Sequence, residues 1–292
     1  MAESETCTRV ADTHCETGEG PIWHPGEGVL YWCDIPNGRL FRYDPRRDDH
    51  ERVLDGEDAL SACTVQTDGS LLLFRAGGRI ERFADGERTT VATVADAADT
   101  RFNDVVADPE GRVFAGTMPT DERLGRLYRI DPDASVTRLD GTYDIPNGMD
   151  FTPAGDAMYA TESERGAVYR FDYDRETGAL ADRERFLDVS GERGVPDGLA
   201  VDASGDVWSA RWNGGAFVRY DATGAEIRRF DVPARKVSCV AFGGPDYRDI
   251  YVTTAGGTDR ATEGDGAGAL FRVRAPDGVR GRAPFRSAVG VE

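Results

Sequence analysis

Three oxygen-bearing side chains, each directly before a glycine, lie far apart in this chain. They are Glu19, Asn147 and Asp197. Two carboxylates and an amide carbonyl are ligands that hard cations such as Ca²⁺, Mg²⁺ and Mn²⁺ accept, whereas Zn²⁺ more often takes nitrogen or sulfur. If the three side chains meet, they can neutralise one divalent cation and leave coordination positions for water and a substrate. The alternative is that each is only a turn residue, since acids and amides before glycine are common in turns.

The three pairs belong to a motif that recurs six times, in which a polar residue precedes a second, mostly small one. The copies are Glu19-Gly20, Ser61-Ala62, Asn103-Asp104, Asn147-Gly148, Asp197-Gly198 and Ser238-Cys239. Their leading residues are separated by 42, 42, 44, 50 and 41 residues. A period of about 40 residues with several short strands in each repeat is typical of β-propeller blades. We therefore predict an all-β fold, a six-bladed β-propeller of four-stranded antiparallel blades, whose leading residues converge at one end of a central channel.

The first repeat shows the expected plan of a blade. Its strands are predicted at Pro21–His24, Val29–Asp34, Arg39–Tyr43 and His50–Leu54, with turn residues between them. The sixth repeat lacks a clear fourth strand. We expect the N-terminal stretch Thr8–Asp12 to supply it and so to close the ring, with a strand at Val279–Arg286 as the alternative. Six blades of about 42 residues use most of the chain, so residues 1–292 are expected to form a single domain.

The charge of the chain is strongly negative. It has 53 acidic and 35 basic residues, a net charge of −18, and Lys236 is its only lysine. Such a surface is typical of proteins from salt-adapted organisms, because self-repulsion is screened within about 3 Å at 1 M salt; an ordinary acidic protein is the alternative. The chain has no basic stripe, which argues against nucleic acid as a partner.

Five cysteines without a C-x-x-C pair give no disulfide framework. No stretch is long and apolar enough to suggest a signal peptide or a membrane span. We therefore expect a cytoplasmic protein that does not bind membranes and is a monomer or a weak homo-oligomer.

Arg101 lies two residues before Asn103, the leading residue of the third repeat. A guanidinium at the entrance of the channel offers forked donors to a carboxylate or to sugar hydroxyls. The alternative is a surface ion pair in an acidic protein.

Several segments around these residues resemble the SMP-30/gluconolactonase family, also called the regucalcin-like family. They include Gly18-Glu19-Gly20-Pro21-Ile22-Trp23, Arg101-Phe102-Asn103-Asp104, Ile145-Pro146-Asn147-Gly148, Val195-Pro196-Asp197-Gly198 and Trp212-Asn213-Gly214-Gly215. The resemblance runs in order over nearly the whole chain. It implies a six-bladed propeller that uses a divalent metal to hydrolyse a sugar lactone to the aldonic acid, in oxidative pentose or hexose catabolism.

The resemblance also implies roles for single residues. Glu19, Asn147 and Asp197 would hold one divalent ion, which could be Ca²⁺, Mn²⁺, Mg²⁺ or Zn²⁺. Arg101 and Asn103 would contact the sugar lactone, and Asp197 would be the general base.

One departure concerns a substrate-binding glutamate that many relatives carry shortly after Gly-Thr-Met. Here Met118 is followed by Pro119 and Thr120, so Asp121 or Glu122 would have to replace that acid. Other readings of the same features are a metal-dependent propeller esterase or phosphotriesterase, and a non-catalytic calcium-binding regulatory protein.

Overall fold

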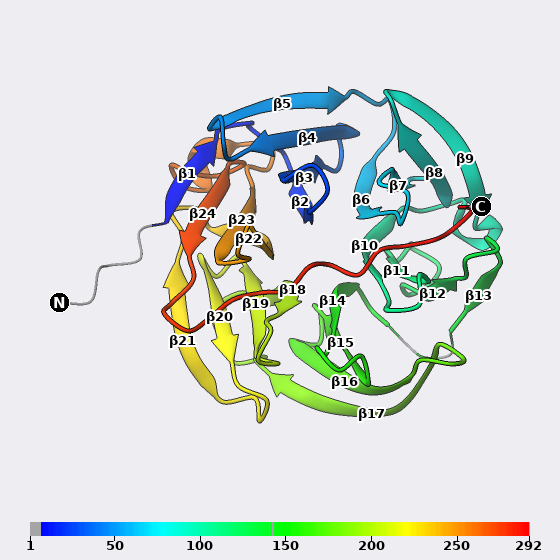
Figure 1. Cartoon of the computed structure of the whole chain (residues 1–292). Coiled ribbons are helices and arrows are strands. Elements are labelled where there is room, and N and C mark those ends of the chain that lie inside the picture. Colours follow the sequence, from blue (N-terminus) through cyan, green and yellow to red (C-terminus); the bar gives the residue numbers. More distant parts are fainter. Residues whose placement is uncertain (1–6, 140, 142, 292) are drawn as a thin grey trace.

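The computed structural model describes residues 7–139, 141 and 143–291. These residues form 24 strands in six four-stranded antiparallel sheets, which are arranged around one axis like the blades of a propeller (Figure 1). Helical structure in the described residues is limited to two short 3-10 turns, Ala95–Ala97 and Arg260–Thr262. The predicted all-β, six-bladed propeller is therefore confirmed.

Each blade begins at the channel and ends at the rim. The first three are formed by β2 (Gly18–His24), β3 (Val29–Asp34), β4 (Arg39–Asp44) and β5 (Asp49–Leu54); β6 (Leu60–Val65), β7 (Leu71–Arg75), β8 (Arg79–Ala84) and β9 (Glu87–Thr93); and β10 (Phe102–Ala107), β11 (Val113–Thr117), β12 (Leu127–Ile130) and β13 (Val136–Arg138). The next two are formed by β14 (Pro146–Phe151), β15 (Ala157–Glu162), β16 (Ala167–Asp174) and β17 (Ala179–Asp188); and β18 (Val195–Val201), β19 (Val207–Trp212), β20 (Ala216–Tyr220) and β21 (Glu226–Asp231). The sixth contains β22 (Lys236–Gly243), β23 (Asp249–Ala255) and β24 (Leu270–Arg274).

The fourth strand of the sixth blade comes from the other end of the chain. β1 (Thr8–Ala11) pairs antiparallel with β24, with Thr8 opposite Arg272 and Ala11 opposite Leu270. This is the place expected for a strand at Thr8–Asp12. The alternative segment, Val279–Arg286, forms no strand. Pairing of the two chain ends leaves no open sheet edge between the first and last blades.

The recurring motif lies inside the inner strands, not before them as the sequence suggested. In all six blades the pairing of the inner strand with its neighbour shifts register at the motif, as between Glu19 and Ile22 in β2. A bulge re-aims side chains locally. Alternation of apolar residues does not reveal such a bulge, which explains why the inner strand predicted at Pro21–His24 begins at Gly18 in the structure.

The second residue of the motif is usually small because neighbouring inner strands approach closely around the axis. A Cβ atom on Gly148 would lie 2.3 Å from the Leu199 nitrogen of the next blade, and one on Gly198 would lie 2.2 Å from Cys239 Sγ. Gly20 likewise faces Ala62, at 3.1 Å. The small residue that recurs in the sequence thus marks the place where one blade contacts the next.

The C-terminal residues 280–291, here called the strap, cross one end of the channel (Figure 1, red). The strap bonds to the hairpins that join first and second strands, as in the pairs Ala203 N to Arg280 O (3.0 Å) and Ala288 N to Gly111 O (2.8 Å). The buried side chain of Gln66 bonds both the carbonyl (2.9 Å) and the N–H (3.1 Å) of Val289. The strap therefore links several blades across the axis.

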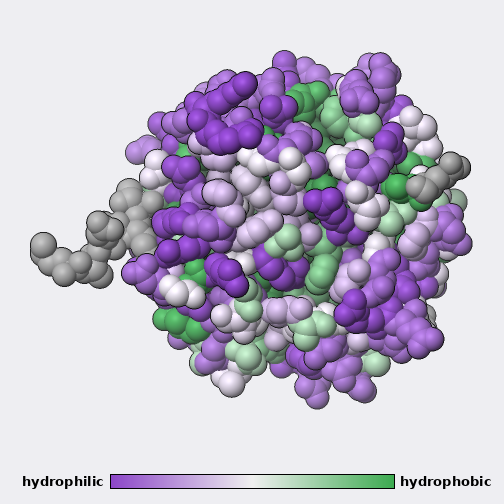
Figure 2. Space-filling model, viewed as in Figure 1, coloured by the Kyte–Doolittle hydropathy of each residue, from purple (hydrophilic) through white to green (hydrophobic). Residues whose placement is uncertain are grey.

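Apolar side chains fill the space between neighbouring blades. Trp208 packs against Phe217, Phe230 and Phe242, with ring centroids 5.4 to 6.1 Å apart. On the strap side, hydrophilic residues cover most of the outer surface and hydrophobic ones form small separate patches (Figure 2). No helix in the described ranges is long and apolar enough to cross a membrane.

Candidate active site

The channel holds two cavities, one at each end of the inner strands. The first, of about 220 Å³, is lined by Glu19, Arg101, Asn103, Asn147 and Asp197, the five residues singled out in the sequence. The structure therefore brings all five to one cavity, although they come from blades one, three, four and five.

We call this first cavity the mouth. The ends of the second strands and the connections from them to the third strands complete its wall. They contribute Ile35, Met118, Ser163, Glu164 and Trp212. Sequence reasoning did not assign a role to any of them. Trp212 lay in a segment that resembled the family, but Ser163 and Glu164 follow an ordinary strand and carry no signal of their own.

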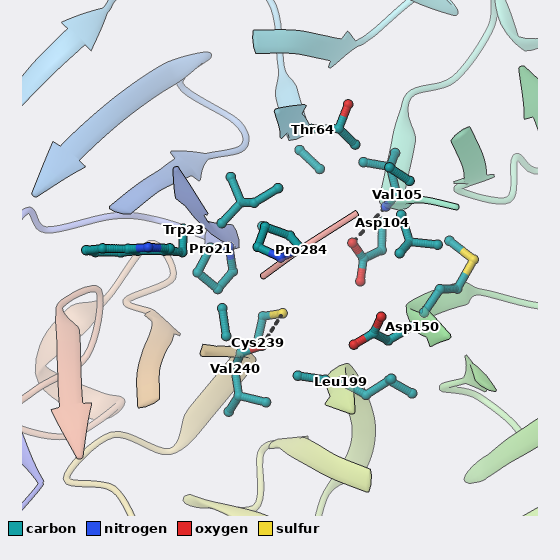
Figure 3. Close-up of a pocket in the computed structure, with 18 of the residues that line it drawn as sticks. Pro21, Trp23, Thr64, Asp104, Val105, Asp150, Leu199, Cys239, Val240 and Pro284 are labelled. Carbon is teal, nitrogen blue, oxygen red and sulfur yellow. Dashed lines mark hydrogen bonds between the residues drawn. The ribbon is translucent and has the colours of Figure 1, made fainter. Parts of the chain in front are cut away.

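The second cavity, of about 120 Å³, lies toward the strap, which contributes Arg282, Pro284 and Phe285 to its wall. Figure 3 shows the carboxylates of Asp104 and Asp150 projecting into it. Arg282 hydrogen-bonds Asp150 and the carbonyl of Phe151 (2.9 Å), and so fixes the strap over this end.

Asn147 and Asp197 are in direct contact. The Asn147 amide nitrogen donates to Asp197 Oδ1 and to Ser163 Oγ (3.1 Å), and the Ser163 hydroxyl donates to the carbonyl of Pro196 (2.8 Å). Both side chains are buried, with 8% and 4% of their surface exposed. Ser163 thus orients Asn147 and links it to the strand that carries Asp197.

Arg101 and Asn103 form a second pair. The Arg101 guanidinium donates to Asn103 Oδ1 and to the carbonyl of Phe102, both at 2.9 Å. The Asn103 amide nitrogen in turn donates to the carbonyl of Pro146 (3.1 Å). Asn103 Oδ1 therefore helps to hold Arg101, which lines the cavity and has further N–H groups that form no hydrogen bond with a described residue.

The charged forms of the carboxylates at the centre of the channel are disfavoured, which raises their pKa values. Burial, followed by the charges of Asp197 and Asp104, raises the pKa of Glu19 well above its usual range, and Arg101 opposes this. Burial and the charge of Asp104 similarly raise the pKa of Asp197, against the hydrogen bond from Asn147. The pKa of Asp104 rises to about 7, mainly through burial. Removal of charged groups from water is costly unless an opposite charge is near.

These residues fit a divalent cation by their chemistry. Among the described residues that line the mouth, Arg101 is the only positive charge, and it makes no ion pair with Glu19 or Asp197. A cation would offset the charges of Glu19 and Asp197 and leave the amide oxygen of Asn147 as a neutral ligand. The amide now presents its nitrogen to Asp197, so binding requires its oxygen to turn to that side. No cluster of three or more His, Cys, Asp or Glu side chains in the described part of the chain could hold a metal. Of the three proposed ligands, only Glu19 and Asp197 are residues of these four types.

The acid expected after Gly-Thr-Met does not line the mouth. Thr120 pairs with Arg123 in a small bridge, and Asp121 and Glu122 are exposed at its tip. Met118 lines the mouth in their place.

Residues 17–256 match the model of the family described as SMP-30/gluconolactonase/LRE-like region. The pentonolactonase XacC of Haloferax volcanii is 51% identical over 97% of this chain and 99% of its own. Regucalcin of Xenopus laevis is 34% identical over 84% of this chain and 85% of its own. The solved structure of a calcium-binding protein, regucalcin, from Agrobacterium tumefaciens superimposes with a TM-score of 0.89 at 29% identity, covering 96% of this chain and 97% of that one. The chain therefore belongs to the SMP-30/gluconolactonase family.

Proposed function

We propose that this protein hydrolyses a sugar lactone to the aldonic acid with the help of one divalent metal ion. Membership of the family supports the reaction class, and the similarity to a pentonolactonase over nearly the full length of both chains supports a sugar lactone as substrate. The polar mouth, with Arg101 facing it, also suits a hydroxylated substrate better than an apolar ester.

Glu19, Asn147 and Asp197 are proposed to hold the ion. When bound, the metal polarises the lactone carbonyl and lowers the pKa values of the neighbouring carboxylates. The name of the Agrobacterium regucalcin relative as a calcium-binding protein supports a divalent metal. We propose Ca²⁺, Mn²⁺, Mg²⁺ and Zn²⁺ as the candidates.

Asp197 is proposed to act as the general base. It accepts a proton from water while the water oxygen adds to the carbonyl carbon, and its hydrogen bond from Asn147 fixes the orientation of the carboxylate. The bond between that carbon and the ring oxygen then breaks, the ring oxygen takes up the proton held by Asp197, and the new carboxylic acid releases its own proton to solvent. The products are one carboxylate and one new hydroxyl group. Arg101, held by Asn103, orients the lactone and pairs with the carboxylate that forms.

The observation that carries this proposal is that two carboxylates, the partly buried Glu19 and the buried Asp197, share one cavity with a single arginine. A pH-stat assay tests it, because hydrolysis of a lactone releases one proton. Metal-stripped protein in multimolar KCl is supplied with each cation in turn and with a panel of aldonolactones. Pentonolactones and gluconolactone come first.

Asp197→Asn and Glu19→Gln should each lower kcat/KM by about 10² to 10⁴. Because burial disfavours their charged forms, both variants should remain as stable as wild type. Glu184→Gln, which removes an exposed charge from β17 on the rim, is the control. Wild-type turnover in either site variant would refute the proposed roles. Metal binding without turnover of any lactone would instead indicate a regulatory calcium-binding protein.

We further propose that the propeller acts as a single domain in the cytoplasm. Its five cysteines are free, and thiols remain reduced in that compartment.

A further inference from the structure

Glu164 is a carboxylate at the mouth that the proposed reaction does not use. It lies in the turn between β15 and β16, is exposed, and lines the same cavity as Glu19 and Asp197. No described residue forms a hydrogen bond or ion pair with it. Its neighbour Arg165 is engaged by Asp144, at 3.0 Å. Glu164 is therefore available to a ligand.

The turn holds Glu164 in place. Gly166 N bonds the carbonyl of Ser163 (3.0 Å), and the Ser163 side chain is anchored to Asn147 and to the carbonyl of Pro196. The residue directly before Glu164 is thus tied to the proposed metal ligands. The backbone at Glu164 is fixed in this way, so only the side-chain torsions of Glu164 lose freedom when it binds a substrate.

Among the charged and amide side chains that the structure describes at the mouth, no other is a free acceptor for substrate hydroxyls. Glu19 and Asp197 are assigned to the metal, Asn103 Oδ1 accepts from Arg101, and Arg101 only donates. A lactone hydroxyl has a proton to donate as well as lone pairs, and leaving that donor without a partner in a cavity is costly. An ionised carboxylate accepts such protons in short, strong bonds.

We propose that Glu164 accepts a hydrogen bond from a ring or side-chain hydroxyl of the lactone and so selects polyhydroxylated lactones. It takes over the task of the acid that relatives carry after Gly-Thr-Met, because Asp121 and Glu122 are exposed and do not line the mouth. Trp212, from the neighbouring blade, lines the same cavity and offers an apolar surface to the C–H groups of the ring. This inference rests on the proposed lactonase function.

The test compares kcat and KM of wild type, Glu164→Gln and Glu164→Leu on two ligands with the same five-membered ring. One is a pentono-1,4-lactone. The other is γ-butyrolactone, which has no hydroxyl groups and is measured as a substrate or as a competitive inhibitor. Glu184→Gln is the matched control, since it removes an equally exposed glutamate from the same blade.

Glu164→Leu should raise KM for the pentonolactone about tenfold to a hundredfold, with kcat within twofold of wild type, because hydrogen bonding to the charged group holds substrate and transition state alike. Glu164→Gln should fall in between. The constants for γ-butyrolactone should not change in either variant, and Glu184→Gln should match wild type on both ligands.

An unchanged KM for the pentonolactone in both variants, or an equal loss on γ-butyrolactone, would overturn the role of Glu164 while leaving the lactonase intact. A fall in kcat at constant KM would also overturn it, since Glu164 would then act in the chemical step. If wild type turns over no lactone, the proposed function fails, and this inference with it.

Discussion

The close packing of inner strands makes Gly148→Ala a sharp test of how the fold positions the site. Gly148 follows Asn147, and its backbone has an ordinary negative φ, so alanine adds no backbone strain. The new Cβ atom would lie 2.3 Å from the nitrogen of Leu199, 2.5 Å from the carbonyl oxygen of Asp197 and 2.6 Å from the carbonyl carbon of Gly198. All three are backbone atoms, which cannot move aside as a flexible side chain can.

Atoms of this kind rest about 3.5 Å apart. β14 and β18 must therefore separate by on the order of 1 Å where Asn147 bonds Asp197. Overpacking of this kind costs about 1 to 3 kcal/mol of stability, and a 1 Å misplacement of catalytic groups costs about 10² in rate. We expect Gly148→Ala to lower the free energy of unfolding by about 2 kcal/mol and kcat/KM for the preferred lactone by about 10².

Urea unfolding and lactone kinetics, both in multimolar KCl, measure the two effects. Gly191→Ala is the matched control, because Gly191 has no heavy atom within 4 Å of the added Cβ and no positive φ. If Gly148→Ala behaves like Gly191→Ala in both assays, neighbouring blades can part without loss, and the explanation of the small residues in the motif is wrong.

Three further changes test separate features. Burial raises the pKa of Glu162 to about 7, above its value of about 4.5 in the unfolded chain. Its contribution to the free energy of unfolding is therefore greatest below about pH 4.5 and is lost as the pH rises through about 7. Glu162→Gln should reduce the loss of unfolding free energy over this pH range by up to about 3 kcal/mol in urea titrations. An unchanged pH dependence would contradict the assignment. Gln66→Leu leaves the N–H and carbonyl of Val289 without partners and should cost about 2 to 4 kcal/mol of unfolding free energy, whereas a neutral change would mean that the strap is not held there. Ser163→Ala removes an acceptor that holds the Asn147 amide nitrogen beside Asp197, so the amide oxygen can turn to the metal more easily and metal binding should tighten about tenfold by calorimetry, with little change in kcat at saturating metal; unchanged affinity would exclude this orienting role.

Much of the fold was predictable because short apolar runs bounded by turn residues mark the second and third strands of the blades. The strand at Val29–Asp34 has the predicted bounds, and the one predicted at Arg39–Tyr43 ends one residue later, at Asp44. The inner strands were harder, because the bulge at each motif interrupts the alternation. The strap was not predictable, since it is held largely by backbone hydrogen bonds, such as that from Ser287 N to the carbonyl of Val65, that leave no pattern in the sequence.

The convergence of Glu19, Asn147 and Asp197 on one cavity also followed from the period. The contacts that these side chains make could not be predicted from the period. Ser163 reaches Asn147 from the turn that follows β15, and the environment of Asp104 depends on how the inner strands meet around the axis. One signal was present for Asp104, because it is the only charged residue among the second positions of the six motif copies.

The position of the strap explains why the motif identifies a reaction class and not a sugar. A propeller channel has two ends, and the strap occupies the end toward which the inner strands run, with Arg282 fixed on Asp150. A lactone must therefore enter between the connections of the second and third strands, past Glu164 and Trp212. The motif positions lie deeper, where every substrate of the class presents the same carbonyl. Residues that distinguish one sugar from another must lie in the connections around the mouth, which fold independently of the repeat and vary without disturbing it.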